Sequence, residues 1–267
     1  MLREKVEMLN VLQDIGEAQS MLSSGEEAKK TKKAAAAVPT VPHPTDVNYA
    51  LLNADLELLS TASFEYKTIK CYLENTKCQR YGSMELYDVW KVDRRGEAQE
   101  FAAHDKIKNR KLLWHGTNVA VVAAIVKSGL RIMPHSGGRV GKGIYLASEN
   151  AKSRQYVRPA YGAKGAGSNV GIMFLCEAAL GKEASITMDN WKLTRPPQGH
   201  DCIVARGIVE PDPSQDVELT INGKQVKVPQ GKPKRMPAFE DSQFSKSEYL
   251  VYKESQQRIR YMMTVKC

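Results

Sequence analysis

Short apolar segments separated by turn residues constrain the fold of this chain most strongly. Few segments have helical periodicity, and they do not alternate regularly with the strands as a doubly wound parallel sheet requires. An Asn222-Gly223 pair within residues 217–228 signals a hairpin turn. The pattern therefore predicts an α+β fold. The segments typical of strands are residues 87–92, 112–114, 171–177, 201–205, 248–252 and 259–265.

Two helices are expected within this strand-rich part. Residues 119–128 have Thr117 or Asn118 before them as a cap and Gly129 after them as a stop. A second, short helix is expected over residues 101–108, after a turn at residues 94–97.

The N-terminal part of the chain has a different character. Residues 1–22 place apolar side chains at helical spacing, which predicts an amphipathic helix. Residues 23–45 are rich in lysine and alanine and contain three prolines, which indicates a linker. We therefore predict a helix and linker over 1–45 and a globular domain over 46–267.

Charge and composition exclude some classes of protein. The net charge of +9 favours nucleic acid, nucleotides or acidic proteins as partners, although an ordinary solvated basic surface explains it equally well. No apolar run approaches the ~20 residues that span a bilayer, so we expect a soluble intracellular protein without a membrane partner. The five cysteines are scattered and form no CxxC pair, so neither a zinc site nor a disulfide framework is expected.

A glycine-rich stretch at residues 137–143 invites comparison with nucleotide-binding loops. It is not a Walker A sequence, because Ser136 replaces the first glycine and Gly143 replaces the Ser or Thr after Lys142. It also lacks the GxGxxG spacing of a Rossmann turn. On sequence alone it is a loop that could flank a ligand.

Three residues stand in compact motifs: His115 after an apolar run, Tyr145 after a Gly-Lys-Gly turn, and Glu248 at the start of a late apolar strand. Taken singly, each is more often structural. Buried carboxylates, however, are rare without a partner or a task. The hypothesis is that the three converge on one pocket that grips a dinucleotide.

The three motifs, in this order, resemble the His-Tyr-Glu catalytic signature of the poly(ADP-ribose) polymerase family, over roughly residues 46–267. The resemblance implies the diphtheria-toxin-like ADP-ribosyltransferase fold, with two packed, mainly antiparallel sheets and flanking helices. Residues 128–143 are most similar to a DNA-break-responsive branch that mainly adds single ADP-ribose units. The motifs that carry the resemblance are residues 112–117, 129–132, 141–147, 152–153 and 248–252.

The resemblance implies a role for each site residue toward NAD⁺. Gly116 holds the nicotinamide carboxamide through its backbone, and the Ser153 hydroxyl makes a second contact. Tyr156 stacks on the nicotinamide ring, and Tyr145 closes the other side. His115 bonds the adenosine ribose.

The remaining roles concern the rest of NAD⁺ and the chemistry. Arg131 lies along the adenine and diphosphate side, Lys152 lies near the acceptor end, and Thr117 and Ala147 complete the binding set. Glu248 is the catalytic residue. Its carboxylate bonds the ribose 2′-hydroxyl and stabilises the positive charge that develops as the nicotinamide–ribose bond breaks. No metal is expected.

We therefore expect an NAD⁺-dependent ADP-ribosyltransferase in the nucleus, active in the response to DNA damage. Acceptor proteins, including the chain itself and histones, are the expected partners. An inactive ADP-ribosyl-fold binding module is the alternative, and a plain nucleic-acid-binding domain ranks last because it explains none of the motifs. Mono- or poly-transfer and the acceptor residue, DNA ends included, stay open.

The same resemblance bears on regulation. Residues 1–22 are similar only to the last helix of the family's helical regulatory domain, and the DNA-sensing modules through which relatives bind DNA breaks have no counterpart here. We expect activity that does not depend on DNA.

Overall fold

The computed structural model describes residues 43–77, 84–133, 137–158 and 170–266. The helix predicted over residues 1–22 and most of the predicted linker lie outside these ranges. The linker's last residues are described, and they begin a helix: α2 (Pro44–Leu51) starts after His43, whose Nδ1 accepts a hydrogen bond from the Thr45 amide.

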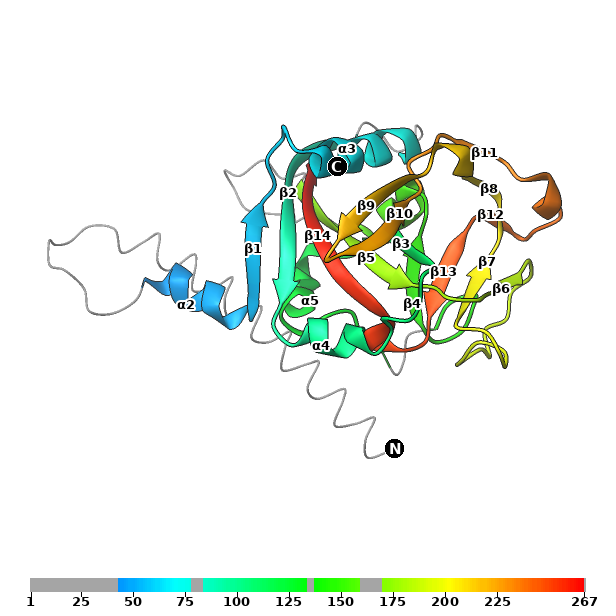
Figure 1. Cartoon of the computed structure of the whole chain (residues 1–267), viewed down its shortest axis with the longest axis horizontal. Coiled ribbons are helices and arrows are strands. Elements are labelled where there is room, and N and C mark those ends of the chain that lie inside the picture. Colours follow the sequence, from blue (N-terminus) through cyan, green and yellow to red (C-terminus); the bar gives the residue numbers. More distant parts are fainter. Residues whose placement is uncertain (1–42, 78–83, 134–136, 159–169, 267) are drawn as a thin grey trace, which may run out of the picture.

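Most strands of the described part form one eleven-stranded sheet (Figure 1). Its main path runs β1-β2-β14-β5-β3-β4-β13-β7-β6, and β10 pairs with both β3 and β9. Among the described strands of this sheet, only the pairs β3 with β10 and β6 with β7 are parallel. The strands are β1 (Ala54–Leu58), β2 (Glu85–Arg94), β3 (Arg110–Gly116), β4 (Ile144–Ala147), β5 (Val170–Ala179), β6 (Glu183–Ile186), β7 (Cys202–Ala205), β9 (Val217–Ile221), β10 (Lys224–Val228), β13 (Glu248–Val251) and β14 (Gln257–Lys266).

A small three-stranded sheet completes the β-structure, in the order β11-β8-β12. Its strands are β8 (Gly207–Pro211), β11 (Pro233–Arg235) and β12 (Phe244–Lys246). The α+β class is confirmed, and antiparallel pairs predominate. The two packed sheets that we predicted are instead joined by hydrogen bonds, because β3 meets β4 at one register pair, Trp114 with Ala147.

The predicted hairpin and the helix after β3 are confirmed. Asn222 and Gly223 adopt positive φ angles of 48° and 73° between β9 and β10, as a tight hairpin turn requires. Asn118 caps the helical segment 119–128, and Gly129 ends it. This segment consists of η2 (Val119–Val121) followed by α5 (Val122–Ser128).

The short helix predicted over residues 101–108 was misplaced. The helix is α4 (Glu97–Ala102), which begins after Gly96 at a φ of 87°. The carbonyl groups of His104 and Ile107 accept hydrogen bonds from the Arg110 guanidinium, at 2.7 and 2.8 Å. The Arg110 side chain thus donates to carbonyl groups that a helix over residues 101–108 would leave for its own backbone amides.

The other helices flank the strands, with α3 and α4 at opposite ends of the long ones (Figure 1). Ser63 caps α3, because its hydroxyl accepts from the Tyr66 amide at 3.1 Å. These elements are α3 (Phe64–Thr76), α6 (Asn150–Ser153), η3 (Arg154–Tyr156), η4 (Pro213–Gln215), η5 (Pro237–Phe239) and η6 (Glu254–Gln256). No described helix has the length and apolar character needed to cross a membrane.

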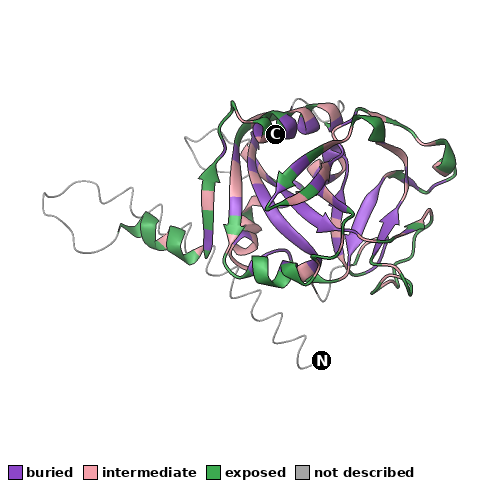
Figure 2. Ribbon diagram, in the orientation of Figure 1, coloured by how far each residue is buried: buried purple, intermediate pink, exposed green. Residues whose placement is uncertain are grey.

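The central strands are buried along most of their length (Figure 2). Side chains alternate between the faces of a strand, so β3 contributes to two cores. Trp114 packs with Tyr72 of α3, at a ring-centroid distance of 4.7 Å, whereas Leu113 packs on the side of α5. Strand β3 is therefore held on both faces.

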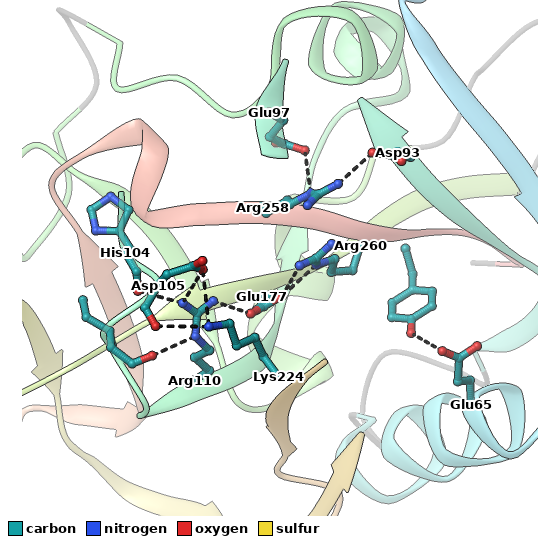
Figure 3. A network of polar contacts seen from close by, with 12 residues as sticks. Glu65, Asp93, Glu97, His104, Asp105, Arg110, Glu177, Lys224, Arg258 and Arg260 are labelled. Carbon is teal, nitrogen blue, oxygen red and sulfur yellow. Dashed lines mark hydrogen bonds and ion pairs between the residues drawn. The ribbon is translucent and has the colours of Figure 1, made fainter. Parts of the chain in front are cut away.

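Buried ion pairs fix β3 along the sheet as well (Figure 3). Glu177 of β5 is fully buried and forms ion pairs with Arg110 of β3 at 2.6 Å and with Arg260 of β14 at 2.5 Å. Both carboxylate oxygens are thereby bonded, which is what makes such a buried charge tolerable. Because Arg110 begins β3 and His115 lies near its end, this network fixes the strand that carries His115.

Candidate active site

A cavity of about 570 Å³ opens where β3, β4 and β13 meet. Its volume lies within the range of small-molecule sites, and its lining is mostly apolar with a few convergent polar groups, as such sites usually are. The convergent polar residues include His115, Tyr145, Lys152, Ser153 and Glu248.

Strand register brings the three motifs together. Ala147 of β4 pairs with Trp114 of β3 on one side and with Glu248 of β13 on the other. His115 directly follows Trp114. Because side chains two apart share a face, Tyr145 and Ala147 project on the same side of β4 as Glu248 does on β13. Residues 133 positions apart in the sequence, His115 and Glu248, thus line one cavity.

His115 is held in a defined protonation state. Its Nδ1 lies 3.0 Å from the carbonyl oxygen of Tyr145. A carbonyl only accepts, so Nδ1 carries the proton. Burial lowers the pKa of His115, with the bond to Tyr145 opposing the shift, so the ring is neutral at pH 7. Nε2 is then unprotonated and can accept a hydrogen bond from a ligand hydroxyl.

The glycine turn after residue 137 fixes the Tyr145 ring. The Tyr145 hydroxyl donates to the carbonyl of Gly141 at 2.7 Å and accepts from the amide of Val140 at 3.0 Å. Gly138 approaches so closely that an added Cβ would lie 2.6 Å from the same hydroxyl. Burial raises the pKa of Tyr145, so the hydroxyl stays protonated. The ring is therefore a rigid wall of the cavity.

Glu248 is a buried carboxylate with one cationic partner. It begins β13, and its Oε1 lies 2.6 Å from Nζ of Lys152, the third residue of α6. The two side chains are only 7% and 20% exposed. The Lys152 ammonium thus holds the Glu248 carboxylate in position at the cavity.

Gly116 and Ser153, which both line the cavity, lie in close backbone contact. A Cβ at Gly116 would lie 1.9 Å from the Ser153 carbonyl oxygen, so no other residue fits without moving α6. The buried Ser153 hydroxyl donates to the Trp114 carbonyl at 3.0 Å. The end of β3 and the helix α6 are therefore locked together.

Comparison with known proteins identifies the family to which the chain belongs. Residues 63–267 match the model of the poly(ADP-ribose) polymerase catalytic domain. The chain belongs to the poly(ADP-ribose) polymerase family.

Several curated relatives match nearly the whole chain. The protein mono-ADP-ribosyltransferase PARP3 of Mus musculus is 54% identical over 265 residues, and that of Homo sapiens 53%; each alignment covers 99% of this chain. Poly [ADP-ribose] polymerase 1 of Xenopus laevis is 31% identical over 271 residues, again covering 99% of this chain. The chain spans about half (48%) of the PARP3 relatives and 25% of the Xenopus protein.

The residues assigned by resemblance to the poly(ADP-ribose) polymerases do gather in one place. All but Thr117 line the cavity. Thr117 is buried beside it, and its carbonyl accepts from the Arg158 amide at 3.4 Å. Tyr156, at the end of η3, is 57% exposed at the cavity wall, and Arg131 is exposed. No cluster of three or more His, Cys, Asp or Glu side chains suited to a metal ion occurs in the described ranges.

One wall of the cavity was not predicted from the sequence. Val121, Ala124, Ile125 and Ser128 line it from η2 and α5. Their spacing of i, i+3, i+4 and i+7 is that of one helical face, so the signal was present. Such a spacing does not by itself predict a ligand site, because an apolar helical face usually packs on a core.

Proposed function

We propose that this domain cleaves the nicotinamide–ribose bond of NAD⁺ and transfers ADP-ribose to acceptor side chains. The observation that carries the proposal is the buried, ion-paired carboxylate of Glu248 in the same cavity as the neutral His115. A carboxylate placed where positive charge develops on a ribose lowers the barrier to breaking its glycosidic bond.

The chain's own groups suggest how the substrate is held. The Nε2 atom of His115 can accept from a ribose hydroxyl, and Tyr145 offers a fixed aromatic wall. Gly116 and Ser153 lie together in the lining of the cavity, where a planar carboxamide can bond. Tyr156 is exposed enough to pack on a flat ring.

Lys152 has a part in this proposal as well. Its ammonium lies 2.6 Å from Oε1 of the Glu248 carboxylate. A ribose hydroxyl that donates to Glu248 shares the carboxylate with Lys152. Lys152 also keeps the carboxylate oriented toward the cavity, so the acidic group is pre-organised for the reaction.

The finer parts of the proposal rest on relatives and on resemblance. The PARP3 relatives are named as mono-ADP-ribosyltransferases, which supports the transfer of single units. Self-modification, histones as acceptors, a nuclear location and action at DNA breaks are carried over from the family resemblance, and are proposed on that basis alone.

Nicotinamide release from NAD⁺ tests the proposal. We expect Glu248→Gln to slow release by about 100- to 1,000-fold, the loss typical when a group that stabilises developing charge is removed. Glu218→Gln on β9, an exposed carboxylate outside the cavity, is the matched control and should retain parental activity. Equal rates for Glu248→Gln and the parent would refute the assignment.

Two further measurements complete the test. Benzamide, a nicotinamide-like ligand, should still bind Glu248→Gln, which shows that the cavity is intact. Intact mass after incubation with NAD⁺ counts the units added per chain. Additions of single ADP-ribose units are expected, and a ladder of many units on one acceptor residue would argue for polymer formation.

A further inference from the structure

The loop between β6 and β7 presents two large apolar side chains to solvent. Trp191 is 70% exposed and Met188 is 64% exposed. Trp191 is the most exposed large hydrophobic residue in the described part of the chain. A single exposed apolar residue needs no explanation, but two of them within four positions on one loop do.

This loop is firmly held. The amide of Asn190 donates to the Arg139 carbonyl at 2.8 Å, and the Arg139 guanidinium pairs with Asp189 at 2.7 Å. The Leu193 side chain packs on a buried cluster that includes Val140. Trp191 is therefore exposed on a fixed scaffold, without the entropy cost of ordering a loose loop on binding.

The scaffold is the same glycine turn that forms the cavity wall. One side of the turn carries Gly138, which lines the cavity against Tyr145. The other side carries Gly141, where an added Cβ would lie 1.9 Å from the Leu193 carbonyl oxygen. The Trp191 loop and the cavity thus lie on the two sides of one turn.

The charge of the loop selects the kind of partner. Lys192 places its Nζ 5.0 Å from the centre of the Trp191 ring, and Arg195 is also exposed. Asp189 is the only carboxylate within residues 187–200, and it is paired with Arg139. The exposed surface is therefore apolar and cationic, which is complementary to a segment that carries apolar and acidic side chains.

We propose that Met188, Trp191 and Lys192, here called the aromatic platform, dock an acidic, extended segment of the acceptor protein. Docking beside the cavity holds a neighbouring acceptor side chain at the mouth of the site. The inference rests on the proposed transferase function and adds to it the surface that selects the acceptor. Tryptophan commonly contributes a large share of binding energy in such interfaces.

Peptide binding tests the platform without requiring catalysis. The probe is a fluorescein-labelled peptide of alternating glutamate and leucine residues, measured by anisotropy with the full chain. We expect Trp191→Ala and Lys192→Glu each to weaken binding about tenfold or more. Phe64→Ala is the matched control: Phe64 is also 64% exposed but lies at the start of α3, so peptide binding should be unchanged.

The outcomes separate the platform from the transferase function. Equal peptide affinity for Trp191→Ala and the parent overturns the platform. Binding of a single-stranded oligonucleotide through Trp191, without binding of the peptide, also overturns the platform. Nicotinamide release without peptide should be the same in Trp191→Ala and the parent, because the platform lies outside the cavity. Absence of release in the parent counts against the transferase function, whereas Trp191-dependent peptide binding stands by itself.

Discussion

The ion pair between Lys246 and Glu149 offers a sharp test of how the strand that carries Glu248 is supported. Lys246 ends β12, two residues before Glu248, and its ammonium contacts Oε2 of Glu149. Glu149 is 1% exposed and precedes α6, the helix that carries Lys152. The other oxygen of Glu149 has no hydrogen-bond partner among the residues that the structure describes. Lys246→Met therefore leaves a buried carboxylate uncompensated.

The expected cost follows from burial. Removing one partner of a buried ion pair costs about 3–5 kcal/mol. The Lys246 side chain is 26% exposed, so water already reaches the ammonium, and the lower end, about 3 kcal/mol, is appropriate. For a domain of this size, about 2–4 °C of Tm is lost per kcal/mol. Lys246→Met should thus melt about 6–12 °C below the parent at pH 7.5.

The loss should depend on pH with a definite sign. Burial raises the pKa of Glu149, and the ammonium of Lys246 opposes that rise. Without Lys246 the folded-state pKa of Glu149 rises further above its value in the unfolded chain. The variant therefore loses stability as the pH increases from the unfolded-state pKa through the folded-state pKa. The difference in Tm from the parent should be small near pH 4 and largest at neutral pH.

Differential scanning fluorimetry at several pH values, with two controls, makes the test decisive. Glu149→Met combined with Lys246→Met removes both charges and should recover most of the lost Tm. Lys234→Met, on β11, breaks a more exposed pair with Asp212, the residue after β8, and should change Tm far less. An equal loss of Tm at pH 4 and pH 7.5, or a double variant as unstable as Lys246→Met, would refute the reasoning.

Three further predictions follow from the site. Gly116→Ala should weaken benzamide binding at least 100-fold in calorimetry, because its Cβ would lie 1.9 Å from the Ser153 carbonyl oxygen; retained affinity would contradict the close contact. Since burial lowers the pKa of His115, NAD⁺ affinity should be flat above pH 7 and fall in acid as Nε2 gains a proton, and His115→Ala should remove this fall. Tyr145→Phe leaves the Val140 amide without its partner and should cost about 1–3 kcal/mol by denaturant unfolding; an unchanged midpoint would count against the role of the hydroxyl.

The strands of this fold could be predicted because their signals are local. The runs around Trp114, Leu175 and Leu250 are apolar enough to predict burial, and each lies in a buried strand. The Asn222-Gly223 turn and the Gly129 stop are equally local, because each depends on backbone conformations that glycine and asparagine tolerate.

What the sequence did not provide depends on contacts between distant residues. The Arg110 side chain bonds the carbonyl groups of His104 and Ile107, within the stretch predicted to be helical, whereas the helix itself lies at Glu97–Ala102. The register that aligns Trp114, Ala147 and Glu248 joins three strands far apart in the sequence. No local pattern encodes such a register, so the motifs alone suggested that the site residues converge, and the resemblance to a family made that expectation specific.

Strands β3 and β4 are joined by a single register pair, Trp114 with Ala147, so the sheet has two parts that meet at the cavity. His115 and Gly116 belong to the part built on β5 and β14, whereas Tyr145 and Glu248 belong to the part built on β13 and β7. A molecule bound in the cavity therefore contacts both parts of the sheet. A change in the distance between the two parts would alter the spacing between His115 and Gly116 on one side and the Glu248 carboxylate on the other.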